Sequence, residues 1–115
     1  MDNTLFYSQV PDKLQGSHKL LEAHIEAFRD FAIKEADMLQ KYREKRSQCV
    51  KQALKDGYTA TSASDVAKGD SAADKAEWLK AVGDKQQCKY NIQAVQDRIY
   101  TIRHLSSQIE HQMKV

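Results

Sequence analysis

The chain has 115 residues, of which 30% are charged, and it contains one proline and four glycines. Eighteen Lys and Arg residues against sixteen Asp and Glu residues give a net charge of +2, which by itself indicates no particular partner. No stretch approaches the roughly 18 consecutive apolar residues of a membrane span, and the N-terminus lacks the pattern of a secretory signal. We therefore expect a cytoplasmic protein without a membrane partner. The length allows one domain, and the scarcity of helix breakers predicts long helices.

The first 16 residues are predicted to form a flexible N-terminal arm. Pro11 and Gly16 interrupt helix continuity in this stretch. Its apolar residues show no helical period: Leu5, Phe6, Tyr7 and Val10. We expect these side chains to fold back onto an exposed part of the helices, and a docking peptide for another protein is the alternative.

A first long helix is predicted from residue 17 to about residue 56. Ser17 is suited to cap its N-terminus, and Gly57 offers the left-handed backbone that commonly ends a helix. Apolar side chains recur along the helix at alternating steps of three and four residues, the spacing of a coiled-coil seam. This first seam comprises Ile25, Phe28, Ala32, Leu39, Tyr42, Cys49 and Ala53, with Glu35 and Arg46 as polar interruptions.

A second long helix is predicted from about residue 71 to residue 114, after a loop at residues 57–70. The loop is rich in Thr, Ser, Ala and Gly, and Ser62 with Asp65 favours at most one short helical turn in it. Ser71 or Asp70 is suited to cap the second helix. The second seam comprises Trp78, Ala81, Cys88, Ile92, Val95, Ile99, Ile102, Ile109 and Met113, interrupted by Lys85 and Ser106.

Two such seams predict an all-α fold, an elongated antiparallel helical hairpin over residues 17–115. Pairing the helix ends would set Cys49 beside a residue near Leu79, roughly 13 Å along the axis from Cys88, so no disulfide is expected within the hairpin. Further apolar residues flank each seam, and self-association is the simplest way to cover them. These flanking residues are Leu20, Leu21, Phe31, Ile33 and Val50 on the first helix, and Leu79, Val82, Tyr90 and Leu105 on the second. We therefore expect a homo-oligomer.

Nothing in the sequence indicates catalysis, and neither a metal nor a cofactor is expected. His104 and His111 are about 10.5 Å apart along a helix, which is too far for one metal ion. Cys49 and Cys88 form no CxxC motif. A Gly-rich phosphate loop and a nucleophile elbow are both absent, so we predict a non-enzymatic protein.

The main functional signal is a basic block at residues 41–55, where six Lys and Arg residues face the single acid Glu44. Two polar stripes follow helical spacing: Lys41, Lys45, Gln48, Gln52 and Lys55 on the first helix, and Lys89, Gln93, Gln96, Tyr100 and Arg103 on the second. Such stripes can follow a phosphate backbone, and a tyrosine ring can stack on an unpaired base. The alternative is a solvated surface of good helix formers.

A basic run, a turn and a closing helix occur in that order along residues 35–113. They are Tyr42-Arg43-Glu44-Lys45-Arg46 continued by Lys51 and Lys55, the turn Gly57-Tyr58, and the isoleucine seam of residues 92–113 with Arg98 and Arg103. This combination resembles the small helical proteins encoded among the recombination genes of tailed bacteriophages. More distantly, it is similar to the UvsY family of phage recombination mediators.

The resemblance implies a homo-oligomeric accessory protein of phage DNA recombination in the host cell cytoplasm. Such a protein binds single-stranded DNA without sequence preference and helps a recombinase or annealing protein to replace single-strand-binding protein. The resemblance assigns the phosphate contacts to Arg43, Lys45, Arg46, Lys51 and Lys55, with Arg98 and Arg103 as further candidates. Lys41 and Tyr100 join the predicted interface from the polar stripes. Arg46 also occupies a seam position, where it could instead pair with Glu35 of another copy.

The alternative function is a structural or adaptor coiled coil that binds only other proteins. Charge reversal at Lys45 and Arg46 would then leave function intact, whereas Ile99→Asp would abolish it. Under the DNA-binding hypothesis both changes impair function.

Overall fold

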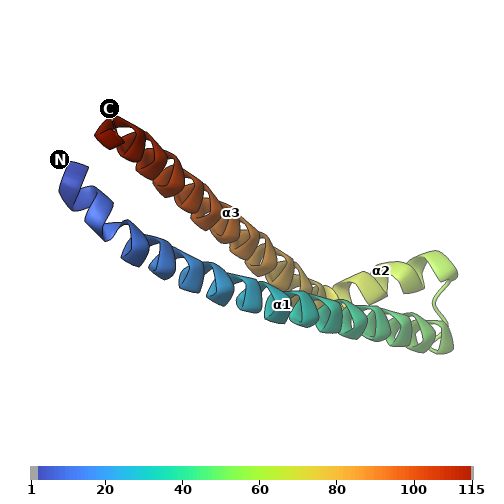
Figure 1. The fold of residues 1–115 in the computed structure, drawn as a ribbon. Helices are drawn as coiled ribbons and strands as arrows, with labels where there is room; N and C mark the ends of the chain where they lie inside the picture. The colour runs from blue at the N-terminus through green and yellow to red at the C-terminus, as the bar shows by residue number, and fades with distance from the viewer. Residues whose placement is uncertain (1–2, 115) are drawn as a thin grey trace. The chain divides into compact units, whose positions relative to one another are not determined.

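The computed structural model describes the backbone of residues 3–114 and the side chains of residues 8–113. This part of the chain forms three helices, α1 (Asn3–Lys55), α2 (Ala60–Asp70) and α3 (Ala72–Lys114), and no strand (Figure 1). The prediction of an all-α protein is therefore confirmed. None of these helices combines the length and the apolar character needed to cross a bilayer.

The chain divides into two compact units: Met1–Phe28 with Gln87–Val115 form unit 1, and Arg29–Gln86, which includes α2, forms unit 2. In unit 1 the Cys88 thiol donates to the backbone carbonyl of His24, with Sγ and O 3.1 Å apart. Arg103 Nη2 lies 3.3 Å from His18 Nε2. Higher residue numbers on α3 thus meet lower ones on α1, so these stretches are antiparallel.

Unit 2 shows the same antiparallel order. Glu35 of α1 forms an ion pair with Lys85 of α3. Further along α1, the ring of Tyr42 stacks on Trp78, with centroids 5.9 Å apart and planes 7° from parallel. The contacts within the two units therefore confirm the predicted helical hairpin.

The predicted seams supply the core of both units. Their buried members are Ala53, Ala81, Cys88, Val95 and Ile99, and their half-buried members include Ile25, Phe28, Leu39, Tyr42, Trp78, Ile92, Ile102 and Ile109. The residues that flank the seams stay largely open to solvent: Leu20, Ile33, Leu79, Tyr90 and Leu105 are exposed. The apolar contact between α1 and α3 is therefore narrow in each unit. Self-association, which would cover the exposed side chains, stays a prediction.

Two polar interruptions of the seams meet each other. Glu35 and Lys85 form an ion pair whose side chains are only 22% and 32% exposed. Glu35 thus finds its partner within the chain and not in Arg46. Because a slip of α3 along α1 would bring each charge against apolar side chains, this pair favours one register of unit 2.

Reversing either charge of this pair is expected to lower the free energy of unfolding. Glu35→Lys would set two lysines against each other, at a cost of about 1–2 kcal/mol because both positions are partly exposed to solvent. The double exchange Glu35→Lys/Lys85→Glu should recover most of that loss. Urea denaturation followed by circular dichroism measures all three variants. A double exchange that is no more stable than the single variants would show that the pair does not favour this register.

The prediction of an arm at residues 1–16 was wrong, because residues 3–16 belong to α1 and Pro11 lies inside the helix. Val10 and Ser17 are buried and Leu14 is half-buried, which continues the seam spacing toward the N-terminus. This burial offsets the cost of a proline in a helix interior, about 3 kcal/mol. The side chains of Leu5, Phe6 and Tyr7 lie outside the described residues, so their packing stays a prediction.

Gly57 ends α1 as predicted. Its φ of +94° is in the left-handed region, which glycine adopts without steric cost. The Gly57 N–H donates to the carbonyl of Leu54 (3.2 Å), and the Tyr58 N–H donates to the carbonyl of Ala53 (3.1 Å). These two hydrogen bonds form a Schellman motif, which satisfies carbonyls in the last turn of α1.

The predicted loop at residues 57–70 was also wrong, because α2 occupies most of it. Thr59 caps α2: its Oγ1 accepts a hydrogen bond from the Ser62 N–H at 3.3 Å. Ala63, Ala67 and Ser71 recur every four residues and are fully buried, so α2 packs closely through small side chains. The Ser71 hydroxyl donates to the carbonyl of Ala67 at 2.6 Å, which joins α2 to the start of α3.

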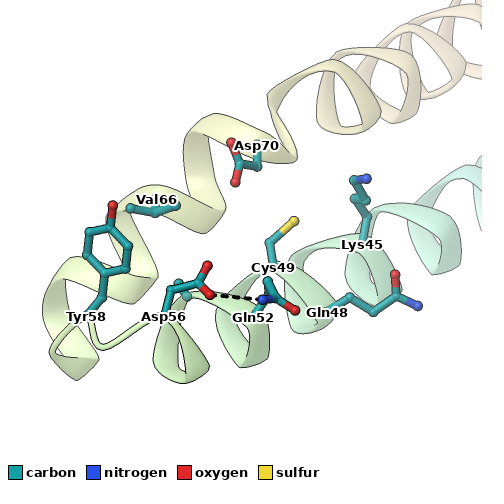
Figure 2. A pocket seen from close by; sticks show the side chains of 9 residues that line it. Lys45, Gln48, Cys49, Gln52, Asp56, Tyr58, Val66 and Asp70 are labelled. Atoms are coloured by element: carbon teal, nitrogen blue, oxygen red, sulfur yellow. Dashed lines mark hydrogen bonds between the residues drawn. The ribbon is translucent and has the colours of Figure 1, made fainter.

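α2 also explains the register of α1 against α3 in unit 2. It lies beside the C-terminal end of α1, and the two helices line a common hollow that holds Cys49 (Figures 1 and 2). In the structure Trp78 consequently lies against Tyr42. The sequence-based alignment, which paired the helix ends, had instead placed a residue near Leu79 beside Cys49. The predicted register was wrong by about two helical turns. Both cysteines are free thiols.

Candidate nucleic-acid interface

Lys41, the first residue of the predicted basic block, has acidic neighbours on α3. Its Nζ lies 4.0 Å from Asp74 Oδ1 and 3.9 Å from Glu77 Oε2, and its side chain is 60% exposed. Ion pairs at this distance and exposure contribute little to stability. They do lower the positive potential that Lys41 offers to a phosphate group.

Lys45 lines a hollow whose other lining residues include two carboxylates. It lines the hollow between α2 and the end of α1, together with Asp56 and Asp70 (Figure 2). Asp56 Oδ1 accepts a hydrogen bond from Gln52 Nε2 at 3.0 Å. With two carboxylates and one lysine in its lining, this hollow carries less positive charge than a hollow lined by cations alone. Lys55 is exposed in the last turn of α1, where a cation favours the helix C-terminus.

The remaining cations of the basic block line a different hollow of unit 2. Arg43, Arg46 and Lys51 surround it, with Tyr42, Ser47 and Val50 as the other lining residues. Arg43 and Lys51 are exposed and Arg46 is half-buried. None of the lining residues is acidic, so this hollow attracts anions.

A second hollow adjoins the first, because Tyr42 and Arg46 line both. It adds Lys68 from α2 and Lys75 from α3. The other lining residues are Ala72, Ala76 and Leu79, so this hollow also has no acidic lining residue. The two hollows together present five cations, which we define as the basic face: Arg43, Arg46, Lys51, Lys68 and Lys75.

Helix geometry explains why the basic block divides. Successive residues of an α-helix are about 100° apart, so Arg46 projects from a different side of α1 than Lys45. The side that carries Lys41 and Lys45 meets carboxylates of α2 and α3. Arg46, by contrast, shares its hollow with cations and apolar residues of those two helices, and Arg43 lines a hollow formed by α1 alone. Among residues 8–113, no ion pair uses a cation of the basic face.

The three candidates on α3 do not form one site. Arg98 lines a hollow of unit 1 that also contains Asp12. Tyr100 is 71% exposed, and its ring stacks on His104 with centroids 6.0 Å apart. Arg103 lies against α1 beside His18. All three belong to unit 1, whereas the basic face belongs to unit 2.

Lys68 and Lys75 were not among the predicted contacts. Lys68 lies in the stretch predicted as a loop, and Lys75 lies outside the basic block. Lys68 precedes Lys75 by seven residues across the junction of α2 and α3, and this spacing becomes informative only once residues 60–70 are known to be helical. In the part of the chain that the structure describes, no group of three His, Cys, Asp or Glu side chains could hold a metal ion. The five cations of the basic face offer electrostatic attraction to an anion.

Comparisons with protein-family models, with curated proteins and with solved structures find no match to this chain.

Proposed function

We propose that the chain binds single-stranded DNA without sequence preference, as a non-enzymatic accessory protein of phage DNA recombination. One observation supports this proposal above the others: the basic face gathers five cations from three helices, and no acidic residue lines its two hollows. A polyanion gains from such a surface by releasing counterions, whatever its base sequence. Weak affinity at one basic face would increase if the chain forms the expected homo-oligomer, because several faces could hold one strand.

Apolar groups between the cations suit an unpaired strand better than a duplex. Leu79 is 50% exposed, and half-buried Val50 lines the first hollow beside Lys51. Unpaired bases can pack against such groups, whereas in a duplex the bases are stacked inside. The resemblance implies that the chain assists a recombinase or annealing protein. In that role the chain would hold the single strand while that partner binds it.

Fluorescence anisotropy of a labelled, mixed-sequence single-stranded oligonucleotide tests this function. Binding should weaken as salt rises, with log affinity falling by about 0.7 per phosphate contacted, or roughly 3.5 per unit of log salt if all five cations take part. An equally long duplex serves as the competitor and should compete less well. Absence of binding at low salt, by a chain that circular dichroism shows to be helical, would refute the proposal.

A protein-binding adaptor is the second candidate function. The exposure of Ile33 (63%) and Leu79 (50%) in unit 2 favours it, because exposed apolar side chains on a helical surface commonly meet another protein. This function predicts that removing cations of the basic face leaves the biological activity unchanged.

A further inference from the structure

The seams contain three charged residues, and one of them forms no ion pair among residues 8–113. Glu35 and Lys85 neutralise each other. Arg46 occupies a half-buried seam position, yet none of the ion pairs or side-chain hydrogen bonds found among residues 8–113 involves its guanidinium. No guanidinium nitrogen of Arg46 is among the buried side-chain atoms that lack a partner, so this unpaired charge is open to an anion from outside the chain.

The surroundings of Arg46 form a hollow of about 350 Å³ at the junction of all three helices. Arg46 enters from α1, Lys68 from α2 and Lys75 from α3. The small side chains Ala72 and Ala76 complete the lining, together with Tyr42 and Leu79. Apolar walls lower the local dielectric constant and so strengthen the attraction between these cations and an anion.

We propose that Arg46, Lys68 and Lys75 form a discrete binding site for a single phosphate group. The guanidinium offers a planar pair of donors that matches two phosphate oxygens, and each ammonium adds a mobile positive charge. Arg43 and Lys51 line only the neighbouring hollow, so they contribute to the basic face without belonging to this site. The phosphate comes from a DNA strand, an assignment that rests on the proposed function, or from a free phosphate ion or phosphomonoester.

Titration with inorganic phosphate tests the site directly. The full chain, labelled with ¹⁵N at arginine side chains, is titrated with phosphate against chloride at constant ionic strength. The Arg46 Nε signal should shift and saturate, and the Arg43 signal should move little. Arg46→Gln should weaken phosphate binding at least tenfold, Arg46→Lys should weaken it less, and Lys45→Gln, which lies outside both hollows of the basic face, should leave it within about twofold. Lys75→Gln offers a second, exposed position should Arg46→Gln impair folding.

An Arg46 signal that does not respond to phosphate would overturn the assignment, and so would phosphate binding by both Arg46→Gln and Lys75→Gln that is as tight as in the unaltered chain. A parallel anisotropy titration separates this outcome from failure of the proposed function. Phosphate binding without oligonucleotide binding would keep the site, assign it to free phosphate or a phosphomonoester, and refute DNA binding. Oligonucleotide binding without a phosphate response would support DNA binding and refute the discrete phosphate site. If both occur, tighter binding of a 5′-phosphorylated strand assigns the site to the strand end, and equal binding assigns it to internal phosphates.

Discussion

Ile99→Asp is expected to unfold unit 1. Ile99 is only 6% exposed in the seam of α3, so the substitution removes a buried apolar side chain and introduces a carboxylate in its place. The two effects together should cost at least about 4 kcal/mol, a large share of the stability of a small domain. Circular dichroism should show a marked loss of helicity, or a fall of the melting temperature by more than about 15 °C.

Gln96→Asp is the matched control for this substitution. Gln96 is exposed on the same helix, so the same carboxylate there should change the free energy of unfolding by only a few tenths of a kcal/mol. Equal melting temperatures for Ile99→Asp and Gln96→Asp would mean that the seam of α3 does not hold unit 1 together.

The double charge reversal Arg43→Glu/Lys51→Glu is expected to abolish binding of single-stranded DNA at moderate salt. It removes two of the five cations of the basic face and adds two carboxylates to a hollow that has no acidic lining residue. We expect affinity at low salt to fall on the order of 100-fold, and the salt dependence to decrease by about 1.4 per unit of log salt. Anisotropy titrations at several salt concentrations measure both quantities.

Lys45→Glu/Lys55→Glu is the charge-matched control. It changes the net charge equally and lies in the same stretch of α1, but neither lysine lines the two hollows of the basic face. Affinity should fall by less than about fivefold, through the net charge alone. The resemblance to phage proteins assigned contacts to all four residues, so equal losses in the two variants would favour that assignment and count against the division made by the fold.

The helices and their seams could be predicted because apolar spacing encodes them directly. The seam of α3 continues on both sides of Lys85, and the structure places Glu35 opposite this charged residue. The start of α1 could not be located in this way, because Pro11 and Gly16 suggested a break. Val10, Leu14 and Ser17 continued the seam spacing through that break, and their burial decided the outcome.

α2 escaped prediction because its composition resembles that of a loop. Small side chains at Ala63, Ala67 and Ser71 give almost no apolar contrast, although their spacing of four residues places them on one side of a helix. The basic block could be predicted, as the seams could, because its residues lie close together in the sequence. Its division into cations beside carboxylates and cations without them depends on α2 and on the register of α3. Lys68 and Lys75 join the basic face only through those two features.

Lysine acetylation footprinting with and without a single-stranded oligonucleotide tests the central claim most directly, because mass spectrometry reads every lysine of the same sample. The division of the basic block predicts that DNA protects Lys51, Lys68 and Lys75 from acetylation. Lys45 and Lys55, which lie on α1 as Lys51 does, should stay as reactive as in the free protein. Protection of Lys45 and Lys55 without protection of Lys68 and Lys75 would contradict the claim that the fold gathers these cations into one DNA-binding face.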